Sequence, residues 1–309
     1  MAASTLQAPK TKTPHAQSAQ EGSRSPPTIC AERDPETFLW LRMHNYRDNL
    51  GALDSVRFRQ PAGATGQYLD VGCGPGTFTT EALLPRLRPC RLLVASDKSA
   101  SMVAYARQHF THPDVVYHQL DIELGDAEPL LARYGQFDRV YSFMTFHYVR
   151  DLERAYRNVF RLLVDGGEFV TVSFTGTAIS DVWKRLCDMP QWKAFVPDPK
   201  QLLAERFCFS TPIPEEQIKA NEEAALCAAG LEMVACSMYD SHWTTTDVDA
   251  WLNYYVPFFR LDANVPEGMR THFRDSCRSL LQEASTTSPE GCSLRHSVLV
   301  IHAQKPTRS

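Results

Sequence analysis

A glycine-rich turn between a strand-like run and a helix-like run limits the fold of this chain more than any other feature. The apolar run covers residues 67–71, the turn reads Gly72-Cys73-Gly74-Pro75-Gly76, and a helix-like pattern extends from Thr77 to Leu87, where Pro85 is expected to kink or end it. Glycine tolerates positive φ and lets the backbone approach a ligand closely, while a helix N-terminus offers free N–H donors. The sequence therefore predicts a β-α unit with a ligand-binding loop at its turn.

Asp70, two positions before Gly72, indicates the charge of that ligand. The motif reads D-x-G-x-G-x-G over Asp70 to Gly76, whereas a dinucleotide-binding loop reads G-x-G-x-x-G. The third glycine comes one residue too early for a dinucleotide, and a carboxylate suits a cationic amine better than a diphosphate. S-adenosylmethionine is therefore favoured as the cofactor, with NAD as the alternative. The loop residues expected to bind it are Asp70, Gly72, Gly74 and Gly76.

Two further strand ends carry acids that suit the nucleoside part of such a cofactor. The strand at residues 91–96 ends at Asp97, whose carboxylate can accept hydrogen bonds from both ribose hydroxyls. The strand at residues 115–120 ends at Asp121-Ile122, where Asp121 can receive the adenine amino group while Ile122 covers the ring face. Acids at a helix start or in a turn are the structural alternatives. Neighbours expected to line the same site are Lys98, Met102 and Phe143.

Alternating strands and helices define the fold class. Further strands are expected at residues 137–143, 168–174, 231–239 and 294–302, and helices after the candidate caps Ser99 and Asp151. Asp165-Gly166-Gly167 is expected to turn the chain into the strand at 168–174. Strands joined by crossover segments pair in parallel. The prediction is an α/β fold: a seven-stranded, mostly parallel sheet with helices on both faces, and helical insertions at about 175–220 and 241–290 that cover the substrate site.

Composition indicates the extent of the domain and the classes of partner. Residues 1–32 are rich in Ala, Ser, Thr, Pro and Gln, so a disordered tail is expected there and a single domain over 33–309. The net charge of −4, without a Lys/Arg cluster, argues against nucleic acid as a partner. No apolar run is long enough for a membrane span. Nine cysteines without a C-x-x-C pair favour reduced thiols and a cytoplasmic location, and no Cys/His spacing indicates a metal.

These landmarks resemble those of the class I S-adenosylmethionine-dependent methyltransferases, which have a Rossmann-like fold. The resemblance covers about residues 40–175 and is carried by residues 70–76, Asp97-Lys98-Ser99 with Met102, Asp121-Ile122 and Asp165-Gly166-Gly167. Within that superfamily, Phe146-His147-Tyr148-Val149, its spacing to Asp151, and Leu83-Leu84-Pro85 resemble the juvenile hormone acid O-methyltransferases of arthropods. The narrower resemblance implies methylation of the carboxylate of an isoprenoid or fatty acid, which gives a methyl ester.

The chain departs from that family at the residues expected to meet the substrate carboxylate. The family has a Gln in a Gln-Lys-Arg-Asp-like stretch and a Trp in a His-Trp-Val-like stretch, which here read Asn45-Tyr46-Arg47-Asp48 and His147-Tyr148-Val149. Asn45 keeps an amide donor and Tyr148 a polar aromatic, so both are expected to hold the carboxylate, with His147 supporting the pocket. A carboxylic acid is already ionised near neutral pH, so no general base is required.

Two other functions stay open. One is a methyltransferase that acts on an oxygen or nitrogen of another small metabolite, for which His147 would be a candidate general base. The other is a non-catalytic S-adenosylmethionine-binding module that works through a partner, which predicts cofactor binding without turnover. In the leading interpretation the partner is a small hydrophobic carboxylic acid, and a homodimer is left open.

Overall fold

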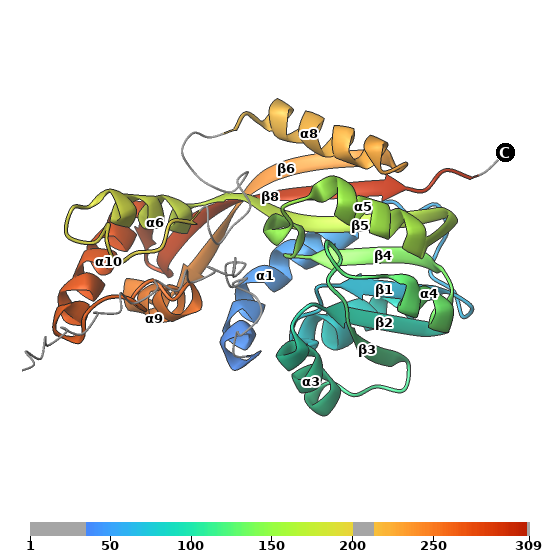
Figure 1. Cartoon of the computed structure of the whole chain (residues 1–309), viewed down its shortest axis with the longest axis horizontal. Helices are drawn as coiled ribbons and strands as arrows, with labels where there is room; N and C mark the ends of the chain where they lie inside the picture. Colours follow the sequence, from blue (N-terminus) through green and yellow to red (C-terminus); the bar gives the residue numbers. More distant parts are fainter. Residues whose placement is uncertain (1–34, 200–212, 308–309) are drawn as a thin grey trace, which may run out of the picture.

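The computed structural model describes residues 35–199 and 213–307, which form a mixed sheet, helices on both of its faces and a helical cap at one end (Figure 1). The expected α/β class is confirmed. The strand order is β3-β2-β1-β4-β5-β8-β6, with β7 paired to β8. The strands are β1 (Gln67–Val71), β2 (Leu92–Asp97), β3 (Val115–Gln119), β4 (Phe137–Phe143), β5 (Leu163–Thr177), β6 (Glu232–Thr245), β7 (Thr286–Ser288) and β8 (Gly291–Gln304).

The parallel part of the sheet is centred on β1. This strand pairs in parallel with β2 on one side and with β4 on the other, and β3 and β5 continue the parallel pairing outward. Because the chain leaves β1 toward one side of the sheet and later returns to fill the other, a crevice is expected at the carboxyl ends of β1 and β4. On the far side of β5, β8 runs antiparallel between β5 and β6.

The sheet has eight strands rather than the seven expected from the sequence. The additional strand, β7, has three residues that fold back on the start of β8, and all three are exposed, so no apolar alternation marks it. The predicted Asp165-Gly166-Gly167 turn lies inside β5 instead of before it. Gly166 has a φ of 78°, and the pairing of β4 with β5 shifts register beside it. The local irregularity interrupts the strand pattern without ending the strand.

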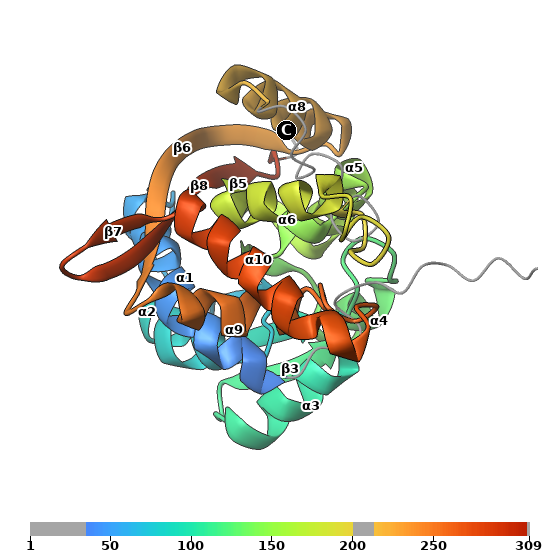
Figure 2. The same cartoon turned by 90° about the vertical axis from the view of Figure 1, so that its left-hand side faces the viewer.

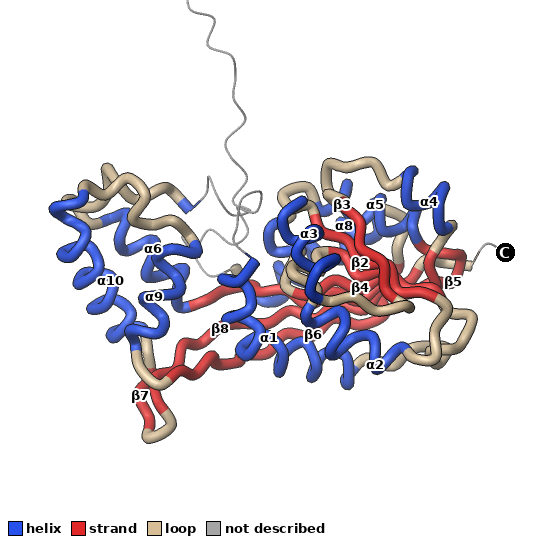
Figure 3. The backbone as a smooth tube through the Cα atoms, turned by 90° about the horizontal axis from the view of Figure 1, so that it is seen from below, coloured by secondary structure: helices blue, strands red, loops and turns tan. Residues whose placement is uncertain are grey.

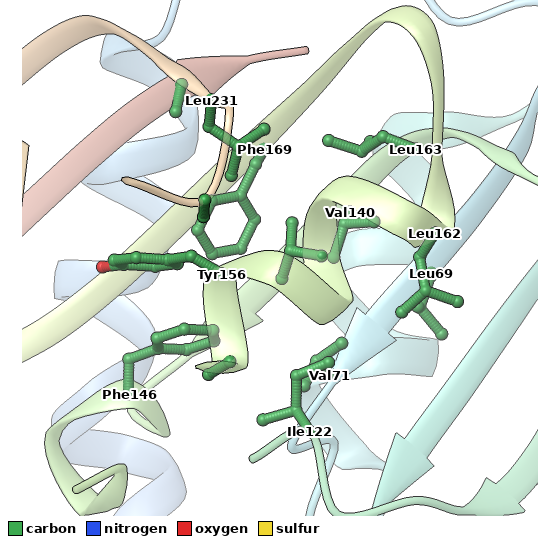
Figure 4. Packing of buried hydrophobic residues seen from close by; sticks show 14 of the residues in the cluster. Leu69, Val71, Ile122, Val140, Phe146, Tyr156, Leu162, Leu163, Phe169 and Leu231 are labelled. Atoms are coloured by element: carbon green, nitrogen blue, oxygen red, sulfur yellow. The ribbon is translucent and has the colours of Figure 1, made fainter. Parts of the chain in front are cut away.

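Helices cover both faces of the sheet. One face is covered by α4 (Glu128–Tyr134), α5 (Leu152–Leu162) and α8 (Glu215–Ala228), and Figure 4 shows apolar side chains packed on this side. The other face is covered by α1 (Pro35–Ser55), α2 (Leu84–Leu87) and α3 (Ala100–His109). Ser99 and Asp151 cap α3 and α5 as predicted, accepting hydrogen bonds from the N–H groups of Met102 (3.3 Å) and Arg154 (3.0 Å).

The helix expected from Thr77 to Leu87 is divided in two. A π-helical turn, η1 (Thr79–Leu83), comes first, and the N–H of Leu84 donates to the carbonyl of Thr79, five residues back. This wide turn leads into α2, where Pro85 lies in the first turn. Pro85 therefore marks the interruption that the sequence predicts.

A cap of three helices lies beyond the ends of β5, β6 and β8 (Figure 2). Its helices are α6 (Ala178–Asp188), α9 (Val248–Phe258) and α10 (Arg270–Ala284), which fall within the two expected insertions. β6 and β8 run past their expected ends into the cap, where Trp243 and Leu294 join its apolar cluster. Near the end of β6 only Ser241 and Trp243 are buried, so the sequence there is mostly polar and does not predict a strand. The expected tail at 1–32 and residues 200–212 lie outside the described residues.

α1 is a helix that the sequence pattern does not predict, and it lies between the cap and the sheet (Figure 3). Its Asp48 is 3% exposed and accepts hydrogen bonds from Ser241 on β6 and His296 on β8, each at 2.7 Å. Burial alone would raise the pKa of Asp48, but the hydrogen bonds from His296 and Ser241 outweigh burial and lower it. As a carboxylate, Asp48 therefore fixes α1 to the antiparallel edge of the sheet.

Candidate functional site

A pocket opens at the carboxyl ends of β1, β2 and β4, where the sheet was expected to leave a crevice. It encloses about 1260 Å³, including the part open to solvent. Every residue predicted for the site lines it except Gly76. The predicted residues in its lining are Asn45, Asp70, Gly72, Gly74, Asp97, Lys98, Met102, Asp121, Ile122, Phe143, His147 and Tyr148.

The first two glycines of the loop shape the floor of this pocket. The N–H groups of Gly72 and Cys73 both donate to the carbonyl of Ser96 on β2, at 2.6 and 2.9 Å. Gly72 has a φ of 78°, and a Cβ there would lie 2.0 Å from Oγ1 of Thr145. Gly74 has a φ of 55°, and a Cβ there would meet nothing within 4 Å. The backbone at Gly74 is therefore accessible to a ligand.

Gly76 has a different neighbourhood. It has a φ of 89°, and a Cβ would lie 2.9 Å both from the Cβ of Ala106 on α3 and from the hydroxyl of Tyr117 on β3. The prediction grouped Gly76 with the ligand-binding glycines, whereas the structure places it outside the pocket lining. Its lack of a side chain lets the loop pack closely against α3 and β3.

Asp70 and Asp97 bring two carboxyl groups to the pocket. Asp70 is 2% exposed and accepts a hydrogen bond from the Thr79 hydroxyl at 2.6 Å. Burial, helped by the charge of Asp97, raises the pKa of Asp70 to about 7. Burial also raises the pKa of Asp97, although the N–H groups of Gly74 and Ser99 donate to it at 2.9 Å each. The buried carboxyl group of Asp70 and the half-buried one of Asp97 repel each other, so they favour a cationic ligand between or beside them.

The turn after β3 supplies the third acid. Oδ1 of Asp121 accepts hydrogen bonds from the N–H groups of Glu123 (2.9 Å) and Leu124 (3.1 Å), and Nδ2 of the buried Asn158 donates to the carbonyl of Ile122 at 2.8 Å. Asp121 therefore stabilises its own turn, as the structural alternative expects, and it also lines the pocket. The turn is held from two sides, which keeps the apolar Ile122 in the pocket wall.

A second group of lining residues comes from α1, from β5 and from the short helix η2 (Phe146–Tyr148). Asn45 and Asn49 lie one turn apart on α1, and within the described parts of the chain their buried Oδ1 atoms have no hydrogen-bond partner. The ring of His147 lies 4.2 Å from the ring of Tyr148 and 5.0 Å from that of Phe174. Amide and phenol groups beside aromatic rings suit an acceptor with a polar head and an apolar body.

The lining residues that were not identified from the sequence include Asn49, Phe174 and Met144. Asn49 has a usable signal, because residues four apart lie on the same helical face and Asn45 was already a candidate. Met144 has no such signal. It follows β4 with a φ of 52°, a strained conformation for a residue other than glycine, and turns the chain from β4 toward η2.

Metal-binding clusters and membrane-spanning helices are both missing from residues 35–199 and 213–307. No three His, Cys, Asp or Glu side chains in these ranges are grouped as metal ligands would be. No helix in them is both long and apolar enough to cross a bilayer. Cys73, within the glycine loop, is buried, and burial raises the pKa of its thiol well above the usual range.

Known proteins with similar sequences agree with this geometry. Residues 69–171 match a family model described as a methyltransferase domain. The juvenile hormone acid O-methyltransferase of Bombyx mori is 35% identical over 130 residues, which is 42% of this chain and 46% of that protein. The enzyme of the same name from Drosophila melanogaster is 29% identical over 137 residues, 44% of this chain and 46% of that protein. The match thus spans about half the length of these curated relatives.

Solved structures share the fold. A protein from Bacillus halodurans C-125 described as a methyltransferase has a TM-score of 0.51 at 15% identity, covering 84% of this chain and 98% of that one. Phosphoethanolamine N-methyltransferase 2 of Haemonchus contortus, solved with S-adenosylmethionine, has a TM-score of 0.50 at 16% identity, covering 88% and 57%. Family match, strand order and fold agree with the resemblance seen in the sequence. Residues 69–171 therefore belong to the class I S-adenosylmethionine-dependent methyltransferases.

Proposed function

We propose that this chain is an S-adenosylmethionine-dependent O-methyltransferase that converts a small hydrophobic carboxylic acid to its methyl ester. The observation that supports it is one pocket that combines the buried acid Asp70 and the half-buried acid Asp97 with amide and aromatic side chains around Asn45 and Tyr148. The first part suits a cationic cofactor, and the second suits the polar head of an acceptor. The similarity to enzymes named for methylation of an acid supports the same class of acceptor.

The residues of the glycine loop fit the methyl donor. Its cationic amine would relieve the repulsion between Asp70 and Asp97, and the open space at Gly74 leaves the loop backbone accessible. Asp97 and Asp121 are proposed to hold the ribose and the adenine. When bound, S-adenosylmethionine supplies an electrophilic methyl group on a sulfonium sulfur. Further contacts are proposed from Gly72, Lys98, Met102, Ile122 and Phe143.

On the acceptor side, Asn45 and Tyr148 are proposed to hold the carboxylate, and His147 to position Tyr148 through the ring contact of 4.2 Å. A carboxylate is already anionic near neutral pH, so these residues need not remove a proton. Their contribution is to align the oxygen with the methyl group and to keep water out, and the ring of Phe174 beside them helps to exclude water. The cap helices are proposed to cover the rest of the acid.

Transfer of a labelled methyl group to a panel of fatty acids, isoprenoid acids, alcohols and amines tests the proposal. Methyl esters should form from acids only. Asn45→Ala with Tyr148→Phe should lower the rate of ester formation about a hundredfold, because two aligning contacts are lost. The matched control, Asn221→Ala with Tyr134→Phe, makes the same changes on α8 and α4, outside the pocket lining, and should keep the wild-type rate. An unchanged rate in the first variant, or methylation of alcohols or amines alone, would refute the proposal.

A further inference from the structure

Three polar side chains are buried in the wall between the pocket and the cap: Trp243, Tyr255 and His296. They are 4%, 5% and 1% exposed. Among the described residues, the indole Nε1 of Trp243, the hydroxyl of Tyr255 and the Nδ1 of His296 have no hydrogen-bond partner. A buried polar atom left without a hydrogen-bond partner destabilises the folded state. A fold that keeps three of them in one place calls for a specific explanation.

The three side chains form one cluster although they come from β6, α9 and β8. The ring of His296 stacks on Trp243 with the centroids 4.1 Å apart, and the ring of Tyr255 lies 6.4 Å from Trp243. Two other indole N–H groups of the cap are satisfied by the protein, since Trp183 donates to the carbonyl of Pro197 at 2.8 Å and Trp251 to that of Cys292 at 3.3 Å, whereas Nε1 of Trp192 has no partner among the described residues. The cap can therefore satisfy an indole N–H internally, and at Trp243 it does not.

The cluster is one side chain away from the pocket. Phe174 lines the pocket, and its ring lies 5.0 Å from that of Trp243 and 5.4 Å from that of His296. Tyr148, another lining residue, is close enough for its charge to affect the pKa of Tyr255, which burial already raises well above the usual range. None of the three cluster residues lines the pocket itself, so an acceptor that reaches their polar atoms from Tyr148 must displace the ring of Phe174.

The chemistry of the cluster defines what it can bind. An indole N–H can only donate a hydrogen bond, and the raised pKa of Tyr255 keeps its hydroxyl protonated and able to donate. Nε2 of His296 is engaged by the carboxylate of Asp48 at 2.7 Å, so only Nδ1 is left for another group. The indole N–H of Trp243 and the hydroxyl of Tyr255 offer two hydrogen-bond donors, so the ligand group that fits is an oxygen that accepts hydrogen bonds.

We propose that Trp243, Tyr255 and His296 form a second recognition site for the acceptor, which binds a hydrogen-bond-accepting oxygen on the body of the acid, away from the carboxylate that is methylated. This inference rests on the proposed function, since it describes the substrate of the same pocket. Its consequence is selectivity: acids with a second oxygen in reach of the cluster bind more tightly than plain hydrocarbon acids of the same length.

Calorimetric titration of the full chain saturated with S-adenosylhomocysteine tests the inference by binding alone. The probes are a saturated straight-chain acid, keto acids of the same length with the carbonyl moved along the chain, and the matching dicarboxylic acid. In the wild type, at least one oxygenated acid should bind roughly tenfold more tightly than the plain acid. If the keto acid binds most tightly, the cluster binds a neutral oxygen; if the dicarboxylic acid binds most tightly, the cluster binds an anionic one.

Tyr255→Phe and Trp243→Phe should each reduce this preference to below about threefold while the dissociation constant of the plain acid stays within a factor of about two. Trp192→Phe is the matched control, because Nε1 of Trp192 also has no partner among the described residues but the ring packs against Phe273 of α10, away from the cluster. This variant should keep the full preference for the oxygenated acid. No preference at any position, or equal weakening of all acids in both variants, would overturn the inference. The absence of any methyl ester with the wild type would instead sink the proposed function.

Discussion

Replacing the three glycines of the loop by alanine, one at a time, should give three different outcomes from the same chemical change. All three have a positive φ: 78° at Gly72, 55° at Gly74 and 89° at Gly76. An L-residue in this conformation costs about 1–2 kcal/mol. Beyond that shared cost, the loss of stability depends on what the added methyl group meets.

The contacts of that methyl group set the expected magnitudes. At Gly74 it meets nothing within 4 Å, so the free energy of unfolding should fall by the backbone cost alone, about 1–2 kcal/mol. At Gly76 it would lie 2.9 Å from Ala106 and Tyr117, and overpacking adds about 1–3 kcal/mol. At Gly72 it would lie 2.0 Å from Oγ1 and 2.6 Å from Cβ of Thr145, so Thr145 itself must move and the loss should be the largest of the three.

Urea unfolding of the ligand-free variants should therefore rank the losses as Gly72→Ala, then Gly76→Ala, then Gly74→Ala. Calorimetry with S-adenosylmethionine should give a different order, because Gly74→Ala puts its methyl group into the pocket and should weaken binding more than Gly76→Ala does. As a control, adding Thr145→Gly removes the close atoms and should recover part of the stability lost in Gly72→Ala. Equal losses of stability in all three variants would refute this account of the loop.

Three ionisable groups give further predictions. Burial raises the pKa of Asp70 from 3.8 to about 7, so at about pH 6 a bound cationic amine should displace close to one proton from this carboxyl group. Calorimetry in buffers of different ionisation enthalpy measures the number of protons released, and Asp70→Asn should release none from this position. The pKa of Asp48 is lowered from 3.8 in the folded protein, so the stabilisation by its carboxylate is present above pH 3.8 and is lost as the pH falls through the folded-state pKa. Asp48→Asn should therefore lower the free energy of unfolding at neutral pH and make that free energy depend less on pH in the acid range. Glu168 is buried between His302 (2.9 Å) and Arg139 (3.5 Å). Glu168→Gln should lower the free energy of unfolding, measured in urea, by about 3–5 kcal/mol, because Arg139 is left without its charge partner. A loss below about 1 kcal/mol would contradict this.

The centre of the sheet can be predicted from the sequence because its strands are buried on both faces. β1 and β4 appear as short apolar runs ended by Gly72 and by the Met144 turn, and their predicted bounds agree with the structure. The acids that follow β1, β2 and β3 could be placed together for a topological reason, since the carboxyl ends of neighbouring parallel strands meet at one edge. That reasoning found the acidic residues of the pocket lining, Asp70, Asp97 and Asp121.

The acceptor side could not be predicted in the same way, because it depends on contacts between distant segments. The sequence of α1 has no amphipathic pattern, and the helix is held by a hydrogen bond between Asp48 and His296, 248 positions later. The cluster of Trp243, Tyr255 and His296 likewise comes from three elements with no shared sequence pattern. Gly76 shows the opposite limit: its place in the motif is visible, but its packing against α3 is not.

The account depends most on the claim that the acids at the ends of β1, β2 and β3 bind the methyl donor. Isothermal titration of the full chain with S-adenosylmethionine, beside the same titration of Asp97→Asn, tests that claim directly. We predict saturable binding to the wild type with one donor per chain, and binding at least about tenfold weaker in the variant, because a charged hydrogen-bond acceptor is lost. No binding heat from the wild type with either S-adenosylmethionine or S-adenosylhomocysteine, or equal affinity in both proteins, would contradict it.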